Sequence, residues 1–360
     1  MIGYNSLKKL KQEKKLIIGY FGGSITEAGG SNGRLGWRGR TTDALKEIYS
    51  DADIIEIQAA IGGTGSDLGA FRLNEDLLIY KPDLVFIEFA VNDSGTAEKR
   101  ISRSIDGIVR SIIIDNPLID IIFIYTTTAS IIEAINNGYG YRSREVMSRI
   151  CDYYNIPFID VGEDLQAAIK DGSTWESLAP DMVHPTDVGH AIYFKKIKAV
   201  MTEFFNINTD VSAPTVSFEL KTPFSENPYH NCCIYDAWNI ENVTDFIKIN
   251  NSLSGRYPHY IEGKAGSTFF FSFKGDILGL YWMIAPDSGK IALSIDDCEE
   301  LIYSSWDSYA LSFSRAGYII INEELTKSEH VLKVRVLEEK DEQSTGFIVR
   351  IGALLLRDLM

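Results

Sequence analysis

The chain has 360 residues, 45% of them hydrophobic and 24% charged, and it is long enough for about two ordinary domains. This composition is typical of folded globular proteins and excludes a disordered or fibrous chain. Its 35 basic and 50 acidic residues give a formal net charge of −15, so most of the surface repels a phosphate backbone and we expect no nucleic-acid partner.

Membrane and secretion signals are weak in this sequence. No hydrophobic run approaches the ~20 residues of a membrane-spanning helix, and the run at residues 16–21 is too short for the core of a signal peptide. We therefore expect no membrane span and a cytoplasmic location. The oligomeric state is left open.

The cysteines show no CxxC spacing, so we expect buried, reduced thiols at Cys151, Cys232, Cys233 and Cys298.

The first half of the chain alternates short apolar runs with longer amphipathic stretches. The runs are continuously apolar, as strands buried on both faces require, and amphipathic stretches begin at Trp37, Ser66 and Asp187. This rhythm predicts a three-layer α/β/α domain with a five-stranded parallel sheet, which we place at residues 1–207. The five expected strands lie within residues 16–21, 53–60, 84–90, 121–128 and 157–161.

A polar, proline-bearing segment at residues 206–216 separates this half from a second one of different character. The apolar runs that follow are short, alternating and aromatic, with turn signals between them and no convincing helical stretch. We therefore predict an all-β sandwich at residues 215–360. Its clearest strands are expected at residues 267–275, 277–284, 290–296, 318–322 and 330–338.

Two glycine-rich segments follow the first two expected strands, at the sheet edge where open α/β sheets bind ligands. Ser24 follows Gly22 and Gly23 and could be a nucleophile, or it could cap a helix or stand in a tight turn. The segment at residues 61–66 contains three glycines, so its backbone amides could donate to an oxyanion or a phosphate. It lacks the Lys-Ser or Lys-Thr end of a P-loop.

Polar side chains also follow the third strand and precede the last helix. Asn92 offers an amide donor for a developing negative charge, or an Asx turn. Asp181 stands three residues before His184, where its carboxylate can hold one ring nitrogen and leave the other as a base. His190 could pair with His184 at a metal, but no third ligand is evident, and we expect neither metal nor cofactor.

In this order and context, the segments GGSIT, AAIGGTG, AVND and DMVHP resemble the four sequence blocks of the SGNH hydrolase superfamily, also called the GDSL esterases. The resemblance covers roughly residues 16 to 205. It implies a flavodoxin-like hydrolase domain with Ser24 as nucleophile, His184 as base and Asp181 orienting the base. It also implies an oxyanion hole made by the backbone amides of Ser24 and Gly63 and the side chain of Asn92.

The sequence departs from the family pattern at two supporting positions: Gly23 replaces the usual aspartate, and Gln58 stands where many members have asparagine. Both changes leave the reaction class in place but weaken any transfer of substrate from lipase-like members.

The second half bears on the substrate. Its aromatic-rich pattern looks like the jelly-roll modules that accompany some sugar esterases, although plain core packing explains the same residues. We therefore expect an esterase that removes a small acyl group, acetyl above all, from carbohydrate. The alternatives are a longer-chain acyl ester or lysophospholipid hydrolase, and a dormant domain in a glycan-binding protein. The aromatic residues concerned are Trp238, Tyr257, Tyr260, Tyr281, Trp282, Trp306 and Tyr309.

Overall fold

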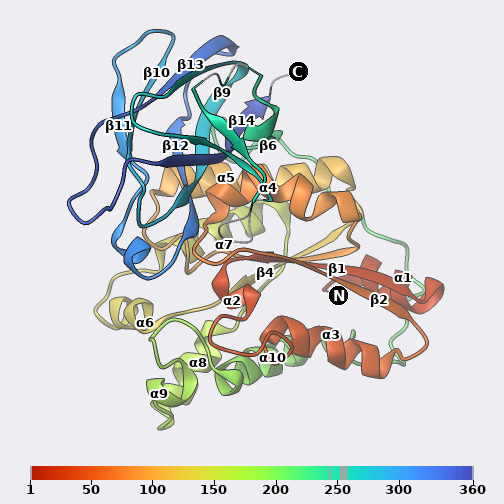
Figure 1. The fold of residues 1–360 in the computed structure, drawn as a ribbon. Helices are drawn as coiled ribbons and strands as arrows, with labels where there is room; N and C mark the ends of the chain where they lie inside the picture. The colour runs from red at the N-terminus through yellow and green to blue at the C-terminus, as the bar shows by residue number, and fades with distance from the viewer. Residues whose placement is uncertain (1, 242, 244, 252–257, 359–360) are drawn as a thin grey trace. The chain divides into compact units, whose positions relative to one another are not determined.

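The computed structural model describes residues 2–241, 243, 245–251 and 258–358 (Figure 1). The chain divides into two compact units, Met1–His230 and Asn231–Met360. The first is built from alternating strands and helices, and the second from strands. Both predicted fold classes are therefore confirmed.

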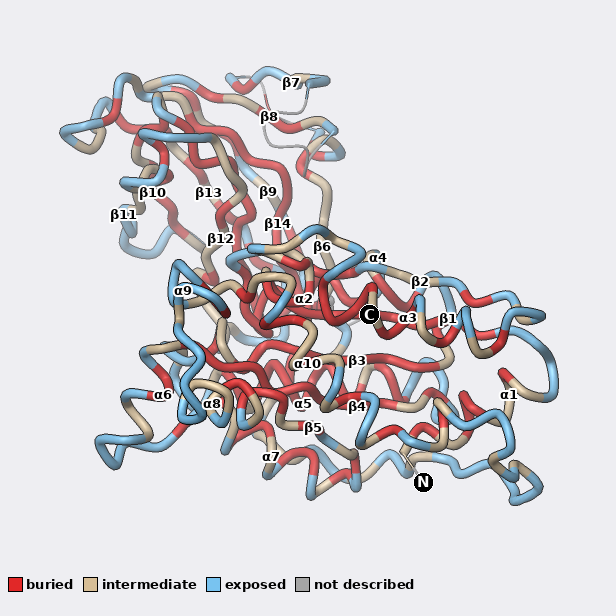
Figure 2. The backbone as a smooth tube through the Cα atoms, turned by 90° about the horizontal axis from the view of Figure 1, so that it is seen from below, coloured by how far each residue is buried: buried red, intermediate tan, exposed pale blue. Residues whose placement is uncertain are grey.

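The first unit contains a five-stranded parallel sheet in the order β2-β1-β3-β4-β5. This is the doubly wound order of flavodoxin-like folds, in which the strand order reverses beside β1. The central strand β3 is buried along its whole length, as its continuous apolar run predicts (Figure 2). The strands are β1 (Lys15–Gly22), β2 (Asp53–Ala60), β3 (Leu84–Glu88), β4 (Asp120–Tyr125) and β5 (Phe158–Asp160).

Helices cover both faces of this sheet (Figure 1). On one face, α4 (Ser66–Asp76) and α7 (Arg142–Tyr154) pack against α5 (Glu98–Asp115). On the other face, α3 (Trp37–Ile48) and α8 (Gly162–Lys170) pack against α10 (Asp187–Val200). The remaining helical segments are α1 (Tyr4–Glu13), α2 (Ser24–Glu27), η1 (Leu78–Tyr80), α6 (Ala129–Asn136) and α9 (Trp175–Leu178). Within the described ranges, no helix has the length and hydrophobicity needed to cross a bilayer.

The segment after α10 is held on the first unit by hydrogen bonds. The backbone N–H of Val216 donates to Asn5 Oδ1 at 2.8 Å, and that of Tyr229 donates to Arg103 O at 2.8 Å. Gly107 lets this segment approach α5, because a Cβ at that position would collide with the backbone of Tyr229. The boundaries expected at residues 207 and 215 both precede the division after His230, and they stay a prediction.

The second unit is a network of antiparallel strands around the long β9 (Thr268–Ile284). The first half of β9 pairs with β13 (Ser328–Val336), and its second half lies between β12 (Arg315–Asn322) and β14 (Val349–Asp358). One strand thus serves two parts of the sheet, as strands that switch sheets do in sandwiches. The other strands are β6 (Cys232–Asp236), β7 (Ile247–Ile249), β8 (Tyr260–Gly263), β10 (Lys290–Ile295) and β11 (Leu301–Ser304), with the short helices η2 (Ala237–Asn239) and η3 (Ser308–Leu311).

The aromatic residues of the second unit divide between core and surface. Tyr260, Tyr281 and Trp282 are buried, and Trp282 belongs to the hydrophobic core cluster of the β unit. Trp238 and Trp306 are half-buried, and Tyr309 is exposed. Tyr257 lies outside the described residues. Core packing therefore accounts for Trp282.

Candidate active site

Ser24 is the first residue of α2, directly after the carboxyl end of β1. The turn into the helix is made by Gly23, whose backbone N–H donates to Glu88 O at 3.3 Å. A Cβ at Gly22 would collide with the same carbonyl, so glycine lets β1 and β3 approach closely at this point. The sequence thus places the Ser24 hydroxyl at the sheet edge, as predicted.

Ser24, His184 and Asp181 form a hydrogen-bonded chain. His184 Nε2 lies 2.8 Å from Ser24 Oγ, and His184 Nδ1 lies 2.6 Å from Asp181 Oδ2. The other oxygen, Asp181 Oδ1, accepts the backbone N–H of His184 at 2.7 Å. These are the contacts of a base that is oriented by a carboxylate and faces a nucleophile.

The Asp181 carboxylate is held in its ionised form. Partial burial acts to raise its pKa, but hydrogen bonds from the backbone and ring of His184 and from the backbone of Val183 outweigh that effect and lower the pKa to about 2. The intervening Met182 has a φ of 68°, and its carbonyl accepts the N–H of Ala129 at 3.0 Å. This turn places the carboxylate of Asp181 next to the imidazole of His184.

Two glycines that the sequence reasoning did not consider lie against His184. A Cβ at Gly29 would stand 2.8 Å from His184 Cδ2, and one at Gly30 would stand 2.9 Å from His184 Cβ. Gly30 also has a φ of +81°, which favours glycine. The connection after α2 is therefore shaped to the base, and a residue with a side chain would displace the ring.

The loop after β2 reaches the nucleophile through its glycines. A Cβ at Gly62 would lie 3.5 Å from Ser24 Cβ, so this backbone passes close to Ser24. The N–H of Gly62 is engaged, because it donates to Glu27 Oε2 at 2.9 Å. The N–H of Gly63 has no acceptor within the described part of the chain, and the φ of +72° explains why a glycine stands there.

Asn92 lies beside the nucleophile turn, and its position explains one departure from the family pattern. A Cβ at Gly23 would collide with Asn92 Oδ1, so a larger residue cannot accompany this placement of the amide. Neither Asn92 Nδ2 nor the Ser24 N–H finds an acceptor among the residues the structure describes. Gln58, the second departure, is exposed on the edge strand β2. The N–H groups of Ser24, Gly63 and Asn92 thus all lack acceptors in the described chain, and Asn92 lies against the turn that carries Ser24.

Two buried carboxyl groups beneath the site were missed by the sequence reasoning. Glu88 accepts the hydroxyls of Thr26 at 2.9 Å and Thr126 at 2.8 Å, and burial raises its pKa. Asp93 accepts the backbone N–H of Ser66 at 2.9 Å, and burial raises its pKa to about 7. Their positions, at the end of β3 and next to Asn92, could have identified them as candidates. Their contacts depend on the tertiary fold.

His190 does not join His184 at a metal. Its Nδ1 accepts the backbone N–H of Trp37 at 3.3 Å, and burial lowers its pKa to about 4. Among the residues described, no group of three or more His, Cys, Asp or Glu side chains could hold a metal ion. His190 is therefore a neutral, buried histidine that helps to hold the start of α3.

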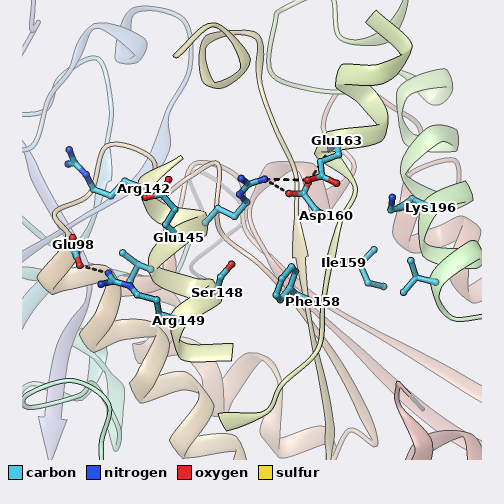
Figure 3. Close-up of a pocket in the computed structure, with 13 residues that line it drawn as sticks. Glu98, Arg142, Glu145, Ser148, Arg149, Phe158, Ile159, Asp160, Glu163 and Lys196 are labelled. Carbon is cyan, nitrogen blue, oxygen red and sulfur yellow. Dashed lines mark hydrogen bonds and ion pairs between the residues drawn. The ribbon is translucent and has the colours of Figure 1, made fainter. Parts of the chain in front are cut away.

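A cavity of about 780 Å³ lies elsewhere in the first unit, between α7, β5 and α10 (Figure 3). Its charged lining is largely paired: Arg144 contacts Asp160 at 2.5 Å, and Arg149 pairs with Glu98. None of the five candidate site residues lines it. The candidate active site is therefore identified by the hydrogen-bonded chain of Ser24, His184 and Asp181, and not by this cavity.

Comparison with known proteins agrees with this geometry. Residues 20–192 match the GDSL-like Lipase/Acylhydrolase family. A search of the curated proteins gives no match. A crystal structure of a two-domain esterase (CEX) active on acetylated mannans, co-crystallized with mannopentaose, is similar with a TM-score of 0.81 and 21% identity, covering 100% of this chain and 96% of that one.

A second crystal structure, also of a two-domain esterase (CEX) active on acetylated mannans, has a TM-score of 0.83 at 21% identity and covers 98% of this chain and 94% of that one. At this identity the likeness establishes a shared fold. The matched residues include Ser24, Asn92 and His184. Residues 20–192, which span most of the α/β unit, are therefore similar to the GDSL-like lipase/acylhydrolase family, the resemblance that the four sequence blocks predicted.

Proposed function

We propose that this ester hydrolase removes small acyl groups, acetyl above all, from carbohydrate, with Ser24 as nucleophile, His184 as base and Asp181 as its orienting partner. The observation that carries the proposal is the chain of short hydrogen bonds from Asp181 through His184 to Ser24.

In the first half of the proposed reaction, Ser24 Oγ attacks the ester carbonyl carbon and its proton passes to His184 Nε2. The carbonyl oxygen becomes an oxyanion, which the N–H groups of Ser24, Gly63 and Asn92 stabilise. The tetrahedral intermediate then collapses. The bond to the alcohol oxygen breaks, the leaving oxygen takes the proton from His184, and the acyl group stays on Ser24.

In the second half, water attacks the acyl-enzyme and gives one proton to His184 Nε2. Collapse of the second intermediate releases the acid and returns that proton to Ser24 Oγ. Asp181 stays ionised throughout, because its pKa of about 2 lies far below neutral pH. Its negative charge stabilises the imidazolium that forms in each half-reaction.

Acetylated mannans are the first substrates to test. The two similar two-domain structures are described as esterases active on acetylated mannans, and each match covers nearly all of this chain. Their identity of 21% supports a common architecture, and the substrate class is our proposal. The proposal requires no nucleic-acid partner, which agrees with the net charge of −15, and it includes a cytoplasmic location.

The test has two parts. Hydrolysis of nitrophenyl esters from acetate to octanoate is measured for the wild type and for Ser24→Ala, and acetate release is then compared on acetylated mannan and acetylated xylan. We expect activity that disappears in Ser24→Ala and falls steeply beyond acetate. Rates that rise with acyl length would overturn the small-acyl assignment. Full activity in Ser24→Ala would overturn the mechanism.

A further inference from the structure

Glu27 connects the nucleophile helix to the glycine loop opposite it. It lies three residues after Ser24, one turn along α2, and its backbone N–H donates to Gly23 O at 3.0 Å. Its side-chain Oε2 accepts the backbone N–H of Gly62 at 2.9 Å. A single four-residue helix therefore both carries Ser24 and holds the loop that contains Gly63.

This contact decides which amide of the loop is available. Because Gly62 N–H is occupied by Glu27, it cannot also bind an oxyanion. The next amide, Gly63 N–H, is the one without an acceptor in the described chain.

We propose that Glu27 is a positioning residue that holds the Gly62–Gly63 loop in register with Ser24, so that Gly63 N–H is preorganised for the oxyanion. This inference rests on the proposed function, because it assigns a role to Glu27 in the same site. Preorganised donors cost no reorganisation during the reaction, so their placement affects turnover more than substrate binding.

The charge of Glu27 opposes catalysis, whereas its acceptor oxygen supports it. A carboxylate near a developing oxyanion is electrostatically unfavourable. Nearby Arg38, which is buried and donates from Nε to Thr26 O at 3.2 Å, offsets part of this charge. Glutamine, a neutral acceptor of the same length, should therefore take over the role of Glu27. Aspartate, a shorter carboxylate, should not.

The experiment compares Glu27→Ala, Glu27→Gln and Glu27→Asp, with Glu56→Gln as the matched control. Glu56 pairs with Arg38 and Arg34, so it belongs to the same charge network. No hydrogen bond or ion pair given for Glu56 in the described chain involves Gly62. For each variant, kcat and KM are measured on nitrophenyl acetate, together with inhibition by phenylboronic acid, whose tetrahedral adduct with a serine presents an oxygen to the oxyanion hole.

We expect Glu27→Ala and Glu27→Asp to lower kcat by about 10- to 100-fold, to change KM by less than about 2-fold and to weaken boronic acid inhibition in parallel. Glu27→Gln should keep most of the activity, because its Oε1 can accept the Gly62 N–H, and Glu56→Gln should match the wild type. If Glu27→Ala does not fold, the positioning role is tested by comparing kcat of Glu27→Gln with kcat of Glu27→Asp.

Three results would overturn the positioning role: equal losses in Gln and Asp, a change confined to KM, or a wild-type kcat in Glu27→Ala. These outcomes are read on activity that depends on Ser24. Activity that persists in Ser24→Ala would instead refute the proposed function itself, so the two failures are distinguishable.

Discussion

A methyl group added at Gly29 should displace the imidazole of His184, the proposed base. Gly29 has no side chain, its backbone N–H donates to Ser24 O at 2.7 Å, and no positive φ prevents an alanine there. In Gly29→Ala, however, the new Cβ would stand 2.8 Å from His184 Cδ2 and 3.1 Å from Ser24 O. Both contacts involve the proposed catalytic pair, so the overlap must be relieved within the site.

The size of the effect follows from these distances. Ordinary contact begins near 3.4 Å, so relief of the 2.8 Å contact requires a displacement of 0.6 Å. If the imidazole of His184 moves away from Ser24 along the line of their hydrogen bond, the 2.8 Å distance between His184 Nε2 and Ser24 Oγ increases toward 3.4 Å. That exceeds the ~2.6–3.2 Å reach of a general base, and we expect kcat to fall by about 10- to 100-fold.

The assay is nitrophenyl acetate hydrolysis with separate kcat and KM, together with the thermal unfolding midpoint. Gly33→Ala is the matched control, because it lies in the same connection and its nearest neighbour would be Arg38 Nη2 at 3.9 Å. The control should keep the wild-type kcat. A wild-type kcat in folded Gly29→Ala would refute the conclusion that Gly29 confines His184, or that His184 is the base.

Asn92→Ala should lower kcat by about 100- to 1,000-fold with little change in KM, because it removes one oxyanion donor; an unchanged kcat would exclude Asn92 from the mechanism. For Asp93, burial raises the pKa from 3.8 to about 7, so its ionisation should destabilise the fold as pH rises from about 4 to 7. Urea unfolding across this range should show Asp93→Asn gaining stability relative to wild type with rising pH, and a parallel pH dependence would contradict the assignment. Gly107→Ala should lower the free energy of unfolding by about 1 to 3 kcal/mol, because its Cβ collides with the backbone of Tyr229; a wild-type value in chemical denaturation would mean that this segment does not pack on α5.

Much of the fold followed from local patterns. Continuously apolar runs predicted strands buried on both faces, and β3 is such a strand. The alternating runs after residue 267 predicted strands that the structure contains as β9, β10 and β13, but the two strands expected at residues 267–275 and 277–284 form the single strand β9. The sequence did not predict β6 or β14, and it gave no sign that residues 216–229 pack on the first unit, because that contact joins segments more than a hundred residues apart.

The candidate site was predicted at the level of residues. Parallel strands present their carboxyl ends at one edge, so segments that follow different strands converge without further information. Ser24, Asp181 and His184 form the expected chain of hydrogen bonds, and Asn92 lies beside the nucleophile turn. Their catalytic roles stay predictions until the variants are measured.

Tertiary structure alone supplied the reasons for individual choices within those segments. Gly23 stands where an aspartate is usual because Asn92 Oδ1 occupies the space of a Cβ, and Gly63 rather than Gly62 has the available amide because Glu27 takes the other. Strand periodicity and residue type are local properties, so they were enough to predict which segments meet and what chemistry those segments can bring. Contacts of a few ångströms between distant segments decide which amide is available, which glycine is required and which carboxylate is buried. These contacts exist only in the folded chain.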